Sequence, residues 1–266
     1  MTGAPSAGLE MKLRALKLPS FVAHHGEVAE RAETDGWRFD QFLDALTDLE
    51  VEERTRRRIE RVLKASHLPA DKTLATLDLA RLPPAVKRQL PTLCEGGFIE
   101  RAENLLAFGL PGRGKSHLLA AIGHELVQRG YRVVFLAAFR LVQQLLAAKR
   151  ALTLEAELRR LDAVDALIVD DIGYVQQDRE EMEVLFTLLA ERYERRSVLI
   201  SSNLVFSQWD QIFKDPMTTA CAIDRVVHHA TILELTGSSY RTEAAKQRNG
   251  GRGPAGAEPP PKEAEA

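Results

Sequence analysis

The residues from Gly109 to Ser116 have the types and spacing of a phosphate-binding loop. They fit the pattern G-x-x-x-x-G-K-[ST], in which glycines let the backbone wrap closely around phosphate groups. The backbone N–H groups of such a loop point inward, and Lys115 adds a positive charge for the β- and γ-phosphates. The Ser116 hydroxyl is suited to bind Mg²⁺. The pattern therefore limits the expected ligand to a nucleoside triphosphate.

The segments on either side of this loop agree with that interpretation. An apolar stretch before it predicts a buried strand, and residues 117–122 predict a helix whose N-terminal dipole favours an anion. A chance glycine-rich turn is the alternative, and these flanks count against it. The residues expected to contact the nucleotide are Gly109, Leu110, Pro111, Gly112, Arg113, Gly114, Lys115, Ser116 and His117.

Polar residues at the ends of two later strands complete a candidate hydrolytic site. Asp170, at the tip of a predicted strand, is expected to bind Mg²⁺ opposite Ser116, and Asp171 to polarise the attacking water. An aspartate after a buried strand is also a common helix cap. Asn203 follows the next predicted strand and would hydrogen-bond the γ-phosphate or the lytic water, because ligands of open α/β sheets bind there. A turn residue would fit the same place.

Two further sets of basic residues are candidates for contacts with partners. Arg225, on a predicted helix, could act as an arginine finger on a neighbouring subunit's nucleotide; a salt bridge to Asp224 or a surface position is the alternative. A predicted helix over 51–64 carries a basic stripe suited to a DNA backbone. Glutamates between its members could instead pair with them along a solvated face. The stripe consists of Arg54, Arg57, Arg58, Arg61 and Lys64.

These side chains need a scaffold, and the second part of the chain predicts an α/β fold. Strands are predicted at 105–109, 131–138, 166–170, 197–202 and 231–235, with helices between them, which favours a parallel sheet between helices. The first part is strand-poor and predicts a small all-helical domain, with separate helices around 39–49 and 51–64. The predicted order is disordered residues 1–10, a helical domain at 11–80, a linker at 81–90, an α/β domain at 91–245 and a disordered tail at 246–266.

Composition excludes several classes of protein. The 266 residues are 45% hydrophobic and 28% charged, which is enough to bury a core. The net charge of −2 means that any nucleic-acid-binding surface must be local. The two cysteines, Cys94 and Cys221, are far apart and are expected to be buried, reduced thiols. No apolar run suits a signal peptide or a membrane span, so we expect a cytoplasmic protein without a membrane partner.

With these motifs the chain resembles the AAA+ ATPases, and in particular the IstB-like transposition helpers, a branch similar to the DnaC-type helicase loaders. The resemblance covers nearly all of residues 11–245, and its most selective strings are Arg192–Ser197 and Ser239–Arg241. It implies that Asn203 is the first sensor and Arg225 the arginine finger. Arg241 would sense nucleotide or bind a neighbour. Arg195 and Arg196 would face a subunit interface, or else end a solvated helix.

The resemblance also implies ligands and partners. These are ATP with Mg²⁺, double-stranded DNA, the transposase of the same mobile element, and further copies of the chain, with dimers building a ring or spiral on DNA. Asp171 stands where most AAA+ proteins carry glutamate, and its shorter side chain predicts slow hydrolysis. A helicase loader, and a nucleotide-gated DNA-binding scaffold with negligible hydrolysis, remain the alternatives.

Overall fold

The computed structural model describes residues 7–174, 179–209, 212 and 216–236. Its contacts divide the chain into two units, the first ending at Ala65 and the second beginning at Ser66. The predicted boundary near residue 80 is therefore too late. Residues 66–80 belong to the second unit because they pack on helix α6 (Lys115–Gln128), where Nε2 of His124 lies 3.0 Å from the Pro69 carbonyl oxygen.

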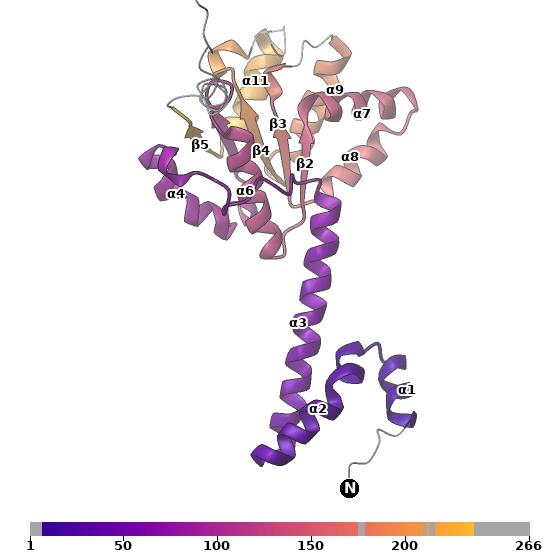
Figure 1. The fold of residues 1–266 in the computed structure, drawn as a ribbon. Coiled ribbons are helices and arrows are strands. Elements are labelled where there is room, and N and C mark those ends of the chain that lie inside the picture. The colour runs from indigo at the N-terminus through magenta and orange to yellow at the C-terminus, as the bar shows by residue number, and fades with distance from the viewer. Residues whose placement is uncertain (1–6, 175–178, 210–211, 213–215, 237–266) are drawn as a thin grey trace, which may run out of the picture. The chain divides into compact units, whose positions relative to one another are not determined.

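The first unit contains helices α1 (Ala7–Ala15), α2 (Pro19–Asp35) and α3 (Phe39–Ser66), drawn in indigo to purple in Figure 1. Helix α1 begins inside the segment predicted to be disordered, of which residues 1–6 lie outside the description. The two helices predicted around 39–49 and 51–64 are one continuous helix. Glu50 lies at their expected junction, and its carboxylate accepts hydrogen bonds from the Ser20 backbone N–H (2.9 Å) and Arg54 Nε (2.7 Å).

This unit buries little apolar surface of its own. Leu46 is the one buried hydrophobic residue among its described residues, with 2% of its surface exposed. By contrast Phe39 is 95% exposed, Met11 71% and Leu16 67%.

The second unit is built on a five-stranded parallel sheet with strand order β2-β3-β4-β1-β5. Its strands are β1 (Asn104–Phe108), β2 (Val133–Ala137), β3 (Ala166–Asp170), β4 (Ser197–Ser202) and β5 (Ala230–Glu234). Each lies within two residues of its prediction, because its apolar run is long enough for one strand. The predicted α/β fold with a parallel sheet is confirmed.

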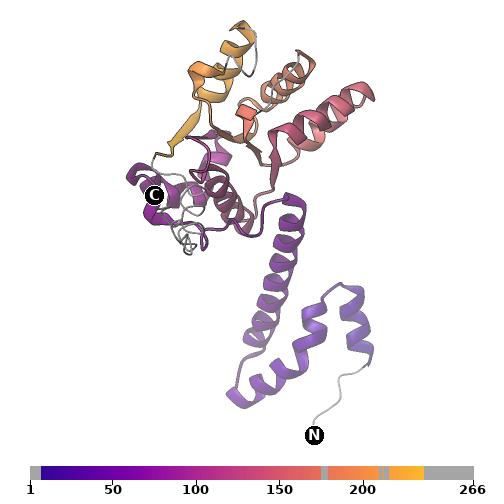
Figure 2. The same ribbon diagram turned by 45° about the horizontal axis from the view of Figure 1, so that its top comes forward.

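Helices cover both faces of this sheet (Figures 1 and 2). On one face α6 packs so closely that a Cβ added to Gly123 would lie 2.9 Å from Ile168 of β3. The other face forms a core with the remaining long helices, and it includes Leu106, Leu167 and Val198 from alternate strand positions. Those helices are α7 (Ala138–Arg150), α8 (Leu154–Asp162), α9 (Arg179–Arg192) and α11 (Pro216–Val227); short 3-10 turns lie at Leu79–Arg81, Ile172–Tyr174 and Phe206–Gln208.

The predicted linker at 81–90 is wrong. Most of it belongs to helix α4 (Pro84–Glu95), which is followed by the short helix α5 (Gly97–Glu100). Val86, Leu90 and Leu93 of α4 are buried, and Arg129 Nε donates a 2.6 Å hydrogen bond to the Cys94 carbonyl oxygen. Pro84 starts the helix because proline is tolerated in the first turn, where its missing N–H has no partner to lose.

The cysteines differ from each other, and only one fits its prediction. Cys94 is buried, and burial raises the pKa of its thiol to about 11. Cys221 is exposed, because it lies on the outer side of α11. Within the described ranges, every helix is too short or too polar to cross a membrane.

Candidate nucleotide-binding site

The loop between β1 and α6 takes its shape from its glycines. Gly112 and Gly114 have φ angles of +79° and +87°, in the left-handed region that favours glycine. Gly109 has a φ of +150°, and a Cβ there would lie 2.5 Å from the Leu235 carbonyl oxygen just after β5. A side chain at Gly109 would therefore push the loop away from the end of the sheet.

Lys115 begins α6, and its side chain folds back over the loop. Its ammonium donates hydrogen bonds to the carbonyl oxygens of Gly109 (2.7 Å) and Leu110 (3.2 Å), and the residue is only 5% exposed. The positive charge thus lies beside the N-terminus of α6, where free N–H groups also favour an anion. Arg113 instead contacts the Leu235 carbonyl oxygen through Nη1, at 3.5 Å.

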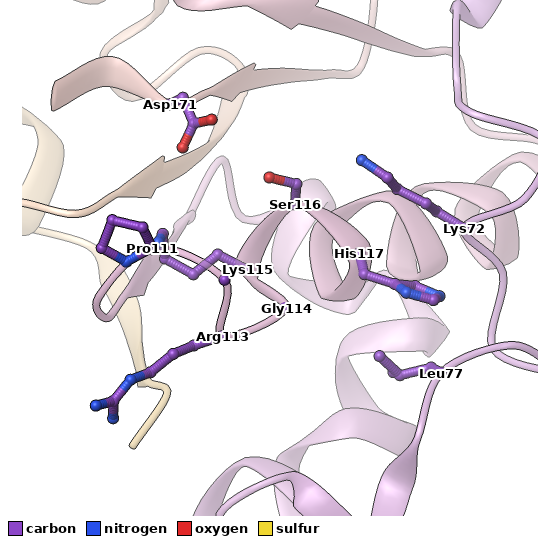
Figure 3. Close-up of a pocket in the computed structure, with 10 residues that line it drawn as sticks. Lys72, Leu77, Pro111, Arg113, Gly114, Lys115, Ser116, His117 and Asp171 are labelled. Carbon is purple, nitrogen blue, oxygen red and sulfur yellow. The ribbon is translucent and has the colours of Figure 1, made fainter. Parts of the chain in front are cut away.

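The loop forms one wall of a cavity of about 540 Å³ (Figure 3). Asp171 lies across the cavity from the loop. The other wall of the cavity comes from the segment before α4, which contains Lys72 and Leu77. Nε2 of His117 anchors that segment, since it lies 3.2 Å from the Thr73 carbonyl oxygen and 3.1 Å from Thr76 Oγ1. The lining residues are Lys72, Leu77, Pro111, Gly112, Arg113, Gly114, Lys115, Ser116, His117 and Asp171.

Lys72 and Leu77 were missed by the sequence analysis. They supply a cation and an apolar side chain, which suit the phosphates and the base of a nucleotide respectively. No repeating pattern marks them, because they come from an irregular segment about 40 residues before the loop. The sequence signal for this segment was His117, directly after Ser116, because its side chain contacts the segment at Thr73.

The two aspartates point in different directions. Asp171 has a φ of +59°, so its backbone turns sharply after β3 and its side chain lines the cavity with the Ser116 hydroxyl. Ser201 of β4 holds this turn: its hydroxyl accepts the Asp171 N–H at 2.8 Å and donates to Asp170 Oδ1 at 2.6 Å. Ser201 was not predicted individually, although it lies in a polar cluster at the end of its strand.

These oxygen atoms fit a magnesium ion. Mg²⁺ prefers oxygen ligands and keeps several waters, and Ser116 and Asp171 offer a hydroxyl and a carboxylate to one cavity. The Asp170 carboxylate is tied to Ser201 at the strand tip beside them. The assignment of Asp170 to the metal and of Asp171 to the water stays a prediction.

Asn203 lies at the end of β4, as predicted, next to the turn that follows β3. Its Oδ1 is buried and has no hydrogen-bond partner among the described residues. A Cβ added to Gly173 would lie 2.0 Å from this oxygen, so Gly173 leaves the room that Asn203 occupies. A buried amide oxygen without a partner is costly and is commonly a functional group.

Arg225 does not line the cavity in its own chain, among the residues described there. Its Cζ lies 4.8 Å from the centre of the Phe186 ring of α9, a cation–π contact. Its Nη1 is buried and has no hydrogen-bond partner in the described part of the chain. The salt bridge to Asp224 that we considered is therefore not the contact that positions this side chain.

The remaining candidate arginines are Arg195, Arg196 and Arg241. Arg195 pairs with Asp162 (2.6 Å) and Arg196 with Asp165 (3.5 Å). Asp165 directly precedes β3, so these arginines lie at the amino end of the sheet, opposite the nucleotide cavity of their own chain. Their role as a sensor or at a subunit interface stays a prediction. Arg241 lies outside the described residues.

The basic stripe is partly neutralised along its own helix. Arg54 pairs with Glu50, and Arg57 pairs with Glu53. Hydrogen bonding from Arg56 holds the pKa of Glu53 below its usual range. Arg61 and Lys64, with Arg57 and Glu60, line a shallow groove. The structure therefore favours Arg61 and Lys64 over Arg54 as cations available to a partner.

Two solved structures illustrate the similarity in fold. DnaI aligns with a TM-score of 0.53 and 21% identity, over 64% of this chain and 95% of that one. AMPPCP-bound DnaA from Aquifex aeolicus aligns with a TM-score of 0.54 and 19% identity, over 70% of this chain and 57% of that one. At these identities the likeness shows the fold alone, which is that of an AAA+ domain.

Relatives found by sequence are more similar to this chain than the solved structures are, and their names refer to insertion sequences. A putative insertion sequence ATP-binding protein of Sinorhizobium fredii is 43% identical over 93% of this chain and 83% of that protein. An insertion sequence IS5376 putative ATP-binding protein of Geobacillus stearothermophilus is 37% identical over 85% of this chain and 90% of that one. Residues 11–248 match the family described as IstB-like ATP binding protein. The chain, with its phosphate-binding loop and facing Asp171, therefore belongs to the IstB-like family of ATP-binding proteins.

Proposed function

We propose that this chain is an ATP-hydrolysing helper of DNA transposition, which assembles on double-stranded DNA and recruits the transposase of the same element. The observation that carries the proposal is an incomplete site. The loop, Ser116 and Asp171 share one cavity, while Arg225 does not line that cavity. A site that needs an arginine from a second copy would make hydrolysis depend on assembly.

The chemistry follows from the residues in place. Lys115 and the N-terminus of α6 would hold the phosphates, and Ser116 with Asp170 would hold Mg²⁺, which neutralises charge on the phosphoryl group. Asp171 would polarise the attacking water while Asn203 fixes its position. The shorter carboxylate at Asp171 suits slow hydrolysis, and so a switch between assembled and released states.

Self-association and DNA contact would involve the first unit. Its exposed apolar residues suit a second copy of the chain, and Arg61 and Lys64 suit a phosphate backbone. The names of the relatives place those proteins in insertion sequences, which favours a transposase as the partner. Delivery of a replicative helicase is the alternative, and it rests on fold likeness alone.

Sedimentation of the full chain with duplex DNA, Mg²⁺ and ATP tests the proposal. We expect large ATP-dependent complexes with the unmodified chain and with Lys87→Ala, a control on the exposed surface of α4. Lys115→Ala should lose them, and Asp171→Asn should keep them while releasing at least about 10-fold less phosphate. Equal complexes with Lys115→Ala would contradict the site. Capture of a hexameric helicase instead of the transposase would favour the loader.

A further inference from the structure

Three potential metal ligands meet at the end of the sheet opposite the nucleotide. Glu194 lies in the turn between α9 and β4, and His228 and His229 lie between α11 and β5. Their candidate ligand atoms are all within 4.8 Å of one another. Because β4 and β5 both begin here, the group is at their amino ends, whereas the phosphate-binding loop follows the carboxyl end of β1.

The geometry of the group is close to that of a coordinated ion. Glu194 Oε1 lies 3.6 Å from His229 Nε2 and 4.0 Å from His228 Nδ1. Zinc binds histidine nitrogen and carboxylate oxygen at about 2.0–2.2 Å, so its tetrahedral ligands lie roughly 3.3–3.6 Å apart. The two imidazole nitrogens lie within 4.8 Å of each other, so rotation of the histidine side chains would bring all three atoms within reach of one ion.

The backbone that carries these ligands is held firmly. Buried Asn104 donates its N–H to the His229 carbonyl oxygen (2.7 Å) and its Nδ2 to the Val226 carbonyl oxygen (3.0 Å). Its Oδ1 accepts the N–H of Val198 in β4 (2.9 Å). Asn104 thus fixes the α11–β5 connection relative to the start of β4. An ion would therefore bind to a backbone that is already ordered.

We propose that Glu194, His228 and His229 form a binding site for a zinc-class divalent ion. Two imidazoles and a carboxylate are the ligand types that zinc accepts, and the half-exposed side chains leave a fourth position for water. The Tyr193 hydroxyl lies 2.8 Å from His228 Nδ1, so this hydrogen bond has to break when that nitrogen binds the ion. The bound ion would join the α9–β4 and α11–β5 connections independently of ATP.

Zinc and cobalt titrations of the untagged, chelator-treated full chain test the site. We expect one equivalent of Zn²⁺ by calorimetry and a visible Co²⁺ spectrum typical of nitrogen and oxygen ligands. His229→Ala and Glu194→Gln should each weaken binding more than about 10-fold. Both variants change exposed side chains, and circular dichroism without metal checks that they fold.

A second pair of adjacent histidines gives a matched control. His24 and His25 of α2 also have a nearby carboxylate, with His24 Nδ1 3.8 Å from Glu27. The double variant His24→Ala, His25→Ala should leave zinc affinity and stoichiometry unchanged. Zinc binding that survives His229→Ala, or that is lost only in the His24 and His25 variant, would overturn the proposal, as would failure of the unmodified chain to bind.

Discussion

Asn203 depends on a neighbour that carries no side chain. Its buried Oδ1 occupies the space beside Gly173, where a Cβ would lie 2.0 Å from this oxygen and 3.0 Å from Leu204 Cγ. The segment after β3 therefore supplies Asp171 to the cavity and, two residues later, the room for Asn203. The segment that carries Asp171 is thus coupled to Asn203 through this contact.

Gly173→Ala should slow ATP hydrolysis at least about 10-fold because Asn203 has to move, while ATP binding changes little. Phosphate release and nucleotide affinity measure the two effects. Gly26→Ala is the matched control, since nothing lies within 4 Å of a Cβ there. If the contact is the cause, adding Gly173→Ala to Asn203→Ala should cost no further activity. Independent losses in the double variant would place the role of Gly173 elsewhere.

At the scale of elements, buried Arg192 joins the end of α9 to the end of α8, to the connection before β3 and to the start of β4. Its guanidinium donates to the carbonyl oxygens of Leu161 (2.7 Å), Val164 (3.3 Å) and Ser197 (2.9 Å), and the residue is 1% exposed. Burial lowers its pKa to about 10, so it remains protonated at neutral pH. The family resemblance rests partly on the string Arg192–Ser197, and these buried hydrogen bonds explain why an arginine begins it.

Arg192→Met should destabilise the second unit by about 3 kcal/mol, because three buried carbonyl groups lose a charged donor. For a unit of this size the midpoint of thermal unfolding should fall by roughly 6–12 °C. Arg195→Met removes two surface ion pairs, with Asp162 and Glu191, and should cost less than about 1 kcal/mol. Circular dichroism measures the unfolding midpoints of the two variants. Equal midpoints would show that Arg192 does not stabilise the second unit more than Arg195 does.

The basic stripe is the other element whose role can be measured. Arg61→Gln with Lys64→Gln should weaken duplex DNA binding and make its dependence on log salt concentration shallower by about 2. Lys12→Gln with Arg14→Gln removes the same charge from α1 and is the control. Arg54 is best left unchanged, since its Nη2 also donates to the Lys17 carbonyl oxygen (2.7 Å). An unchanged slope would make the stripe a solvated face.

Elements were predictable where local sequence decides them. The five strands were found because each is an apolar run of strand length, and the polar residues at the ends of β3 and β4 placed Asp170, Asp171 and Asn203 at one end of the sheet. Helix α4 was missed because Pro83 and Pro84 suggested a break, whereas packing on α6 favours a helix. Lys72 and Ser201 depend on tertiary contacts between segments far apart in sequence, which no local pattern records.

For the whole molecule, the central question is whether one chain holds a complete hydrolytic site. Arg225 packs on Phe186 with one guanidinium nitrogen buried and without a partner in the described part of the chain, and it is outside the cavity that Lys115 lines. A head-to-tail contact between copies would bring the arginine of one chain to the nucleotide of the next. Such an arrangement makes a definite prediction for mixed assemblies.

Lys115→Ala and Arg225→Ala should each abolish hydrolysis alone and restore it when mixed. The first variant still offers its arginine and the second still binds ATP, so a junction with ATP on the second and the arginine of the first is complete, and part of the activity should return. Phosphate release on duplex DNA measures the recovery. Mixing Arg225→Ala with a chain carrying both substitutions is the control, because no junction then has an arginine. If the first mixture is as inactive as this control, Arg225 acts within its own chain or not at all, and the dependence of hydrolysis on assembly fails with it.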